Sequence, residues 1–321
     1  MLSTRSSGTI VLAGIWILSW IPRLAAAAEP ADTDQPSAEE QGDAEQLAKS
    51  VQNPVADLVS VPFQNNTTYN VGPNDRAANT LNIQPVIPLH LSESWMLISR
   101  IVVPISYQPF LDSATGGTSA VGDANPTFFL SPANAGKLIW GVGPAFLLPT
   151  ATQTAVGTGK WSVGPSAVGL VQTKHWTVGA LASQIWSFAG PDDRSAVSLM
   201  TIQYFVNYNL AHAWYLSSSP ILTFNWKASD GNEWTVPFGG GVGKIFKLGK
   251  LPLNGQVQGY YNLHADNATE IGNWQLRIQL AFLFPTAKPK APKQQEEEQR
   301  AAASPPPGRK LDAGCTARAA N

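Results

Sequence analysis

The feature that most constrains this chain is a two-residue alternation of apolar and polar side chains over long stretches. In Trp274–Pro285 the even positions are all aromatic or aliphatic, whereas the odd positions begin with Gln275, Arg277 and Gln279. Successive side chains of a β-strand point to opposite faces, so the pattern predicts a strand with one apolar and one polar face. A tilted strand of about 9–11 residues crosses a membrane. The stretch is therefore long enough to be a transmembrane strand.

The same alternation recurs along the body of the chain, and the connectors between the stretches alternate between short and long. Transmembrane β-barrels of the outer-membrane type have short periplasmic turns and longer outer loops. We therefore predict an all-β fold, a transmembrane antiparallel up-and-down β-barrel of about 12 strands, with a disordered N-terminal leader and C-terminal tail. An even strand number leaves both ends on the periplasmic side. The expected strands are 55–66, 80–88, 95–107, 122–131, 138–149, 161–173, 176–188, 197–209, 214–226, 233–244, 253–261 and 271–284.

Tryptophan placement supports a membrane barrel over a soluble β-sandwich. Nine of the eleven tryptophans fall in the body, and they gather near the two ends of the expected strands. The indole ring prefers the membrane–water boundary, whereas a sandwich core has no need to place tryptophan at strand ends. The predicted membrane-interface girdle consists of Trp95, Trp140, Trp161, Trp176, Trp186, Trp214, Trp226, Trp234 and Trp274.

The charge content excludes several other classes of protein. Only 13% of the 321 residues are charged, the formal net charge is −1 and there is one cysteine, Cys315. A disulfide scaffold needs paired cysteines, and a nucleic-acid binder usually carries a basic excess. Within residues 53–285, eleven acids balance eleven bases, and most of them lie in connectors. The strands themselves are therefore nearly free of charge, as a lipid-facing wall requires.

The two ends of the chain differ from the body in composition. Residues 1–28 read as a Sec-type signal peptide: Arg5, then an apolar run over 9–21, then small residues that place cleavage near Ala28. Residues 29–52 form an acidic periplasmic leader, and residues 286–321 form a Pro-rich charged tail. Within the leader, Ala44–Val51 could form a short helix that serves as a linker or as a small plug in a pore, and we favour the linker.

The polar phase of the strands defines the expected lumen. It is rich in neutral amides, and its mid-strand charges are Arg100 and Arg277, which would cost about 2–4 kcal/mol each if they faced lipid at the midplane. Amides offer donors and acceptors without trapping ions, and arginines favour anions. A wall that satisfies its own polar groups is the alternative to a permeation path. The predicted lumen-lining residues are Gln64, Asn82, Gln84, Arg100, Gln203, Asn207, Asn225, Gln256, Gln258, Gln275, Arg277 and Gln279.

Several stretches also resemble a Gram-negative outer-membrane family described as transporter-like, or as the MetA pathway of phenol degradation, whose members sometimes carry the name "neuromedin U" by mistaken transfer. The resemblance implies an outer-membrane β-barrel that passes aromatic or hydrophobic compounds, and it brings no catalytic residues. The tail after Pro285 departs from the family, because barrel-assembly signals usually lie in a terminal strand. The stretches are 52–66, 81–89, 97–109, 148–152, 157–168, 201–210, 214–226, 234–250 and 274–285.

The sequence therefore predicts a non-enzymatic channel in the outer membrane for passive passage of small solutes. A structural barrel without transport is one alternative. An outer-membrane hydrolase is another alternative, for which the sequence offers His264, close to Asp266, as part of a catalytic pair. Neither a cofactor nor a metal is expected, since cysteine pairs and histidine clusters are lacking. The expected partners are outer-membrane lipid, the barrel-assembly machinery and the solute, and no nucleic acid.

Overall fold

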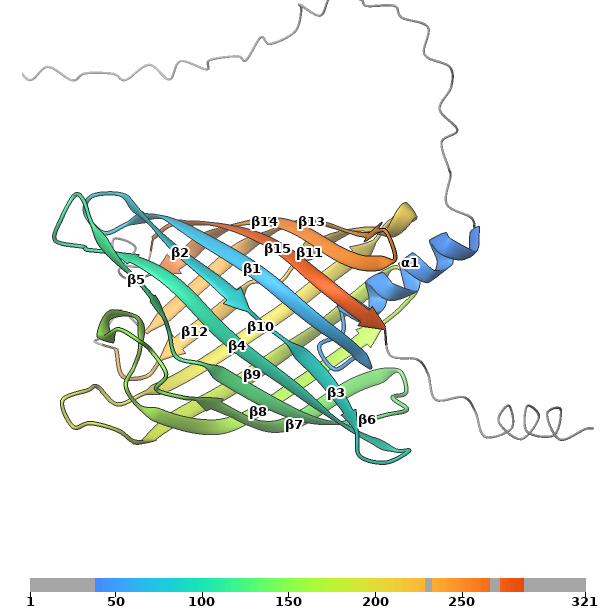
Figure 1. The fold of residues 1–321 in the computed structure, drawn as a ribbon, viewed down its shortest axis with the longest axis horizontal. Helices are drawn as coiled ribbons and strands as arrows, with labels where there is room; N and C mark the ends of the chain where they lie inside the picture. The colour runs from blue at the N-terminus through green and yellow to red at the C-terminus, as the bar shows by residue number, and fades with distance from the viewer. Residues whose placement is uncertain (1–37, 229–232, 266–271, 286–321) are drawn as a thin grey trace, which may run out of the picture. The chain divides into compact units, whose positions relative to one another are not determined.

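The structure, a computed structural model, describes residues 38–228, 233–265 and 272–285. The expected signal peptide, the start of the leader, Asp266 and the tail lie outside these residues. Figure 1 shows tilted antiparallel strands that wrap into a barrel. Within the described ranges, no helix has both the length and the apolar character needed to cross a membrane.

Fifteen strands build the wall, and they group into twelve barrel strands because three barrel strands are each interrupted once. The interrupted ones are β2 with β3, β5 with β6, and β11 with β12. The bounds are β1 Leu58–Val71, β2 Arg76–Ile83, β3 Val86–His90, β4 Trp95–Pro109, β5 Gly117–Val121, β6 Asn125–Pro132, β7 Leu138–Leu147, β8 Trp161–Gln172, β9 Trp176–Ala189, β10 Ser198–Asn209, β11 Trp214–Ser218, β12 Ile221–Asn225, β13 Trp234–Leu248, β14 Leu251–Ala265 and β15 Trp274–Pro285.

The barrel closes through the first and last strands. β1 pairs antiparallel with β15 over twelve residue pairs, from Leu58 opposite Pro285 to Tyr69 opposite Trp274. Each other barrel strand pairs with its neighbours in sequence, and every pairing is antiparallel. Closure leaves no unpaired sheet edge. The predicted twelve-stranded up-and-down barrel is confirmed.

Two of the three interruptions end with a proline, directly before the strand resumes. Pro85 separates β2 from β3, and Pro220 separates β11 from β12. Proline has no backbone N–H and cannot donate to the ladder, but it does not break a strand by itself, since Pro104, Pro144 and Pro165 lie within uninterrupted strands. The third interruption spans residues 122–124 and contains Gly122.

The main errors in the expected boundaries concern two connectors. The first hairpin turns over residues 72–75, where a long loop was expected between Thr67 and Asn79. Residues 245–252, expected as a connector, extend β13 and β14 to a two-residue turn at Gly249–Lys250. Both turns use positive φ angles, +72° at Gly72 and +62° at Gly249, so glycine permits a tighter reversal than the long polar loop expected at 67–79 and the short connector expected at 245–252.

The leader contains a longer helix than expected. Helix α1 spans Ala38–Val51, and two single-turn 3-10 helices, η1 (Thr154–Val156) and η2 (Ala211–Ala213), lie in connectors. α1 lies at the same end of the barrel as the short turns (Figure 1) and contacts η2 and β13. The end that carries the short turns is called the turn end below, and the opposite end is called the loop end.

Gly243 lies where a larger side chain would meet a buried tyrosine ring. A Cβ atom at Gly243 would lie 2.3 Å from the ring of Tyr215, which is fully buried and donates to Asn254 Oδ1 at 2.6 Å. We expect Gly243→Ala to destabilise the barrel by about 1–3 kcal/mol, since the ring must move. The measurement is the temperature at which the compact form is lost in a heat-modifiable gel shift. Gly259→Ala on β14 is the control, because nothing lies within 4 Å of its added methyl group; equal loss in both variants would contradict the account.

Candidate functional site

The barrel interior is the candidate functional site, and the register places the predicted lumen residues on its inner phase. Gln64 lies opposite Gln279 and Asn82, and Gln258 lies opposite Arg277. Among the predicted set, Gln64, Gln84, Asn207, Gln258 and Arg277 are buried. Five others (Asn82, Gln203, Gln256, Gln275 and Gln279) and Arg100 are partly buried, and Asn225 is exposed at the loop-end rim. Their lumen role remains a prediction.

Arg277 forms the centre of a polar layer near the loop end. Its Nε donates to Asn66 Oδ1 at 2.9 Å, and its Nη1 donates to the carbonyl of Ser219 at 2.8 Å. The guanidinium carbon lies 4.9 Å from the ring centroid of Tyr260, a cation–π distance. The Tyr260 hydroxyl in turn accepts the N–H of Ser219 at 3.2 Å. A buried guanidinium is thus held by neutral groups from β1, β14 and the break before Pro220.

A second arginine lies one layer closer to the turn end. Arg100 Nη2 donates to Gln84 Oε1 at 2.7 Å, and the Gln84 amide nitrogen donates to Gln64 Oε1. Gln64 and Asn66 are successive inner residues of β1, so the two arginine layers are adjacent. Neither arginine forms an ion pair with a described residue. The interior therefore carries two positive charges whose described partners are neutral.

Sequence reasoning missed part of the arginine environment. Ser219 and Gln84 both stand directly before a proline that interrupts a strand, and each provides an acceptor for an arginine. Outside a regular ladder, the Ser219 carbonyl is available to Arg277. A proline inside an alternating stretch does not by itself mark such a position, since Pro104, Pro144 and Pro165 lie in strands that are not interrupted. Tyr260, which contacts Arg277, also lay outside the predicted set.

An apolar cluster lies between the arginine layers and the turn end. Val55, from the segment that joins α1 to β1, is 2% exposed. Around it lie inner residues of β4, β6, β8, β9 and β10. These are Met96, Ile98, Phe129, Val168, Leu170, Leu181 and Phe205. Gly141 on β7 also approaches, since an added Cβ would lie 3.2 Å from Val55 and from Phe129. The segment between α1 and β1, whose residues from 55 onward were expected in the first strand, therefore brings Val55 inside the barrel.

Helix α1 forms a second apolar cluster with the opposite part of the wall. Ala48 packs with the buried side chains Leu58, Ala213, Ile245, Ala281 and Leu283. Two hydrogen bonds fix the end of the helix: Gln172 Nε2 donates to the carbonyl of Lys49 at 2.8 Å, and Gln52 Nε2 donates to Asn209 Oδ1 at 2.7 Å. The end of α1 therefore packs against inner residues of the wall at the turn end. α1 and residues 52–57 are called the plug below.

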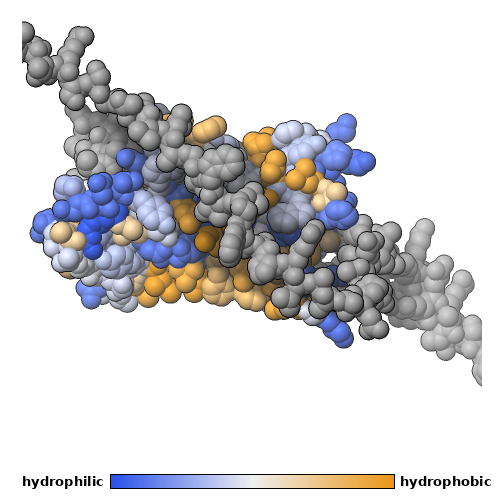
Figure 2. Space-filling model, turned by 90° about the horizontal axis from the view of Figure 1, so that it is seen from above, coloured by the Kyte–Doolittle hydropathy of each residue, from blue (hydrophilic) through white to orange (hydrophobic). Residues whose placement is uncertain are grey.

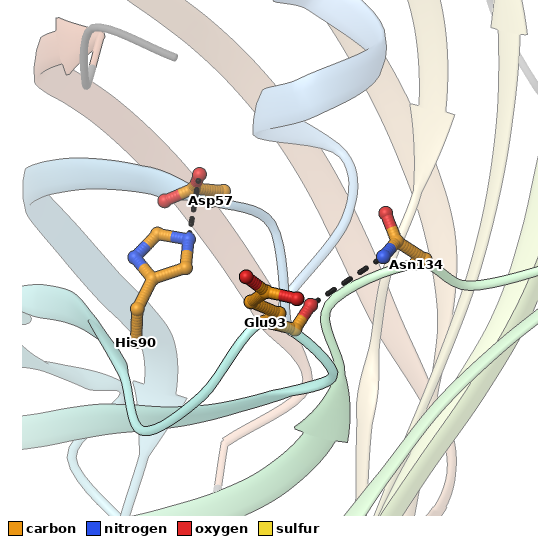
Figure 3. Close-up of polar contacts among 4 residues, drawn as sticks. All are labelled: Asp57, His90, Glu93 and Asn134. Atoms are coloured by element: carbon orange, nitrogen blue, oxygen red, sulfur yellow. Dashed lines mark hydrogen bonds and ion pairs between the residues drawn. The ribbon is translucent and has the colours of Figure 1, made fainter. Parts of the chain in front are cut away.

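A polar contact joins the end of the plug to a short turn. His90 Nε2 lies 3.2 Å from Asp57 Oδ2, and the Asn134 amide nitrogen lies 3.4 Å from the carbonyl of Glu93 (Figure 3). Asp57 ends the plug, whereas His90 ends β3. These groups are partly or fully exposed, so their contribution to stability is small.

At the loop end, one long loop is held by a buried carboxylate. Asp123 accepts the N–H of Ala151 at 3.0 Å and the N–H and hydroxyl of Thr158 at 2.6 and 2.8 Å. Arg194 donates to the carbonyls of Thr154, Gly157 and Thr158 from the other side. Charge-assisted hydrogen bonds of this kind are about twice as strong as neutral ones. Residues 148–160 therefore form a fixed loop at the rim.

The outer surface has the opposite character. Eight of the nine predicted girdle tryptophans are exposed, and Trp140 is half-buried with its ring edge-on to Trp95 at 6.1 Å. Figure 2 shows an apolar band across the body between polar ends. Exposed outward positions include Val142, Val178, Leu216, Val257 and Ile278. An apolar surface of this extent needs a nonaqueous environment or a partner to cover it.

The described residues contain no group of three or more metal-ligating side chains. His264, considered above as part of a catalytic pair, lies in strand β14 opposite Val236 and not in a loop.

Comparison with known proteins gives a fold likeness and no family assignment. No protein-family model matches the sequence, and no curated protein matches it. An outer membrane channel from Pseudomonas putida F1 is similar in structure, with a TM-score of 0.56 and 18% identity over 72% of this chain and 97% of that one. The NanC porin gives 0.44 and 12%, covering 70% and 98%. Outer membrane phospholipase A from Escherichia coli gives 0.38 and 13%, covering 75% and 97%. The first likeness shows a shared barrel fold.

The hydrogen bonds of Asp123 hold the loop of residues 148–160 at the loop end. Asp123→Ala leaves the Ala151 and Thr158 donors without their acceptor, so we expect residues 148–160 to open more often and trypsin to cleave after Lys160 about tenfold faster. Asp193→Ala is the control, because Asp193 is exposed beside the same loop. The measurement is limited proteolysis of the detergent-solubilised protein, and unchanged cleavage of the Asp123 variant would contradict the assignment.

Proposed function

We propose that this protein is an outer-membrane channel for passive passage of small solutes. The observation that carries the proposal is the reversal of polarity across the wall of a closed barrel. Amides and two arginines occupy the inner face, whereas exposed aliphatic side chains and tryptophans occupy the outer face. A soluble barrel has the reverse arrangement, with its apolar side chains inside.

The outer face supports a location in the outer membrane. Trp95 and Trp140 lie beside each other near the turn end, while Trp226 and Trp234 contact each other near the loop end at 6.5 Å. Two aromatic belts flanking an apolar band are what the two membrane boundaries require. The turns would face the periplasm, in agreement with a signal peptide on residues 1–28. Lipid and the barrel-assembly machinery remain proposed partners, and no cofactor or catalytic residue is assigned.

The side chains of the interior favour small neutral or weakly anionic solutes. Arg277 and Arg100 have only neutral described partners, so an entering anion would meet uncompensated positive charge. Tyr260 adds an aromatic face beside Arg277. The family resemblance, with its link to phenol degradation, adds aromatic or hydrophobic compounds to this class.

The packing of the plug supports a solute path that opens and closes. Val55 and Ala48 belong to buried apolar clusters that together involve β1, β4, β6, β8, β9, β10, β13 and β15. The turn-end half of the interior is therefore filled, and a solute larger than water passes only after the plug moves. The polar half faces the long loops.

Arg277 provides the test of solute charge. Arg277→Gln removes one positive charge from the interior and keeps a hydrogen-bonding side chain, so we expect the anion-over-cation permeability ratio to fall about fivefold. Reversal potentials in planar bilayers under a salt gradient measure this ratio. Arg277→Lys is the control and should keep most of the anion preference. An unchanged ratio in the glutamine variant would refute the role of Arg277 in selectivity.

Val55 provides the test of the plug. Val55→Asp places a carboxylate in an apolar cluster, at a cost of several kcal/mol, so the segment should leave the barrel and single-channel conductance should rise several-fold. Gln46→Glu adds the same charge to the exposed face of α1 and should leave conductance near that of the unmodified protein. If both variants, correctly folded by gel shift, conduct nothing for any solute, the barrel is structural and the proposal fails.

A further inference from the structure

A cavity of about 610 Å³ lies at the turn end where the plug meets the barrel wall. One side is helix α1, and the other is formed by the β8–β9 and β10–β11 turns. Its lining combines basic side chains with aromatic and aliphatic ones. The main lining residues are Lys49, Lys174, His175, Tyr208, Asn209 and Trp214.

The cavity is positively charged. Lys49 comes from α1 and Lys174 from the β8–β9 turn, and neither forms an ion pair with a described residue. Glu45 is the one acidic side chain in the lining. Asn209 borders the same space, and its amide nitrogen is buried without a hydrogen-bond partner among the described residues. Two ammonium groups suit a ligand with several acceptor oxygens.

The opposite wall of the cavity belongs to the aromatic belt. The rings of Tyr208 and Trp176 lie 4.7 Å apart, and Lys244 lies 4.7 Å above the Trp214 ring. On the membrane side of this belt, the outward residues Val178 of β9 and Leu216 of β11 are apolar and exposed. The cavity therefore lies at the boundary between the aqueous phase and an apolar outer surface.

We propose that this cavity binds an anionic glycerophospholipid of the membrane leaflet that surrounds the turn end. The phosphate lies between Lys49 and Lys174, and the acyl chains run along the apolar wall beyond Trp214. This assignment rests on the membrane location given under Proposed function, and it extends that function by linking the plug to a lipid.

Binding at this place would stabilise the seated plug. Lys49 belongs to α1, whereas Lys174 belongs to the barrel, so without an anion the two like charges oppose docking. A phosphate between them converts repulsion into attraction on both sides. The bonds from Gln172 to the Lys49 carbonyl and from Gln52 to Asn209 lie at the same junction. The lipid thus acts on the part of the helix that the barrel already holds.

Native mass spectrometry of the full chain in a zwitterionic detergent, titrated with phosphatidylglycerol or phosphatidylcholine, tests the site. We expect one tightly retained phosphatidylglycerol, and about thirtyfold weaker binding in the Lys49→Gln/Lys174→Gln variant, because each lysine contributes about fivefold. The control is Lys137→Gln/Lys250→Gln, which removes two exposed lysines from other short turns and should change binding less than about twofold.

Equal weakening in both double variants, or equal retention of the two lipids, would overturn the proposal in favour of nonspecific attraction to a basic surface. If the Lys49→Gln/Lys174→Gln variant fails the heat-modifiability test, Lys174→Glu alone takes its place, because that side chain is exposed in a turn. Lipid retention is measured without any solute. A protein that does not retain the lipid therefore refutes the lipid site and leaves the proposed channel function standing. A protein that retains the lipid but does not conduct refutes the channel function and leaves the lipid site standing.

Discussion

The rest of the structure depends on the pairing of β1 with β15. In a hydrocarbon environment every backbone N–H and C=O group must find a partner within the protein, because water is absent. Twelve residue pairs between the first and last strands remove the edges that an open sheet would expose. Once the sheet is closed, each strand has an inside and an outside, and the two-residue alternation of the sequence becomes a difference between the inner and outer faces of the barrel.

Closure also creates an interior that the side chains must fill, and this chain fills it in two ways. Near the loop end, Arg277 and Arg100 are held by amides, a carbonyl and a tyrosine ring. Near the turn end, Val55 and α1 bring apolar side chains from outside the strands. A buried charge without a counterion is expensive to maintain, whereas an apolar plug is stable as long as it stays dry. The interior therefore combines a charged polar half with an apolar half that contains residues from outside the strands.

The sequence predicted the barrel because alternation is local and survives in each strand separately. Strands β4, β9 and β10 begin and end within two residues of their expected positions. The errors have physical causes: Gly72 and Gly249 allow turns that are tighter than the connectors expected at 67–79 and 245–252. The plug was the harder problem, since α1 has weak apolar character and its partners are inner side chains of strands far away in sequence. Likewise, the contact between Arg277 and Ser219 depends on closure and on the break before Pro220, neither of which alternation encodes.

In the proposed channel, the polar half of the interior opens towards the loop end, and the plug closes it at the turn end. Gln275→Cys in a Cys315→Ser background places one thiol on the inner phase of β15, near the loop end. Its labelling rate in proteoliposomes, with a membrane-impermeant thiol reagent added to one side at a time, measures access directly. The account predicts rapid labelling from the loop side and very slow labelling from the turn side. Equal rates from both sides would show that the plug does not close the barrel, and no labelling from the loop side would show that the interior is not a solute path.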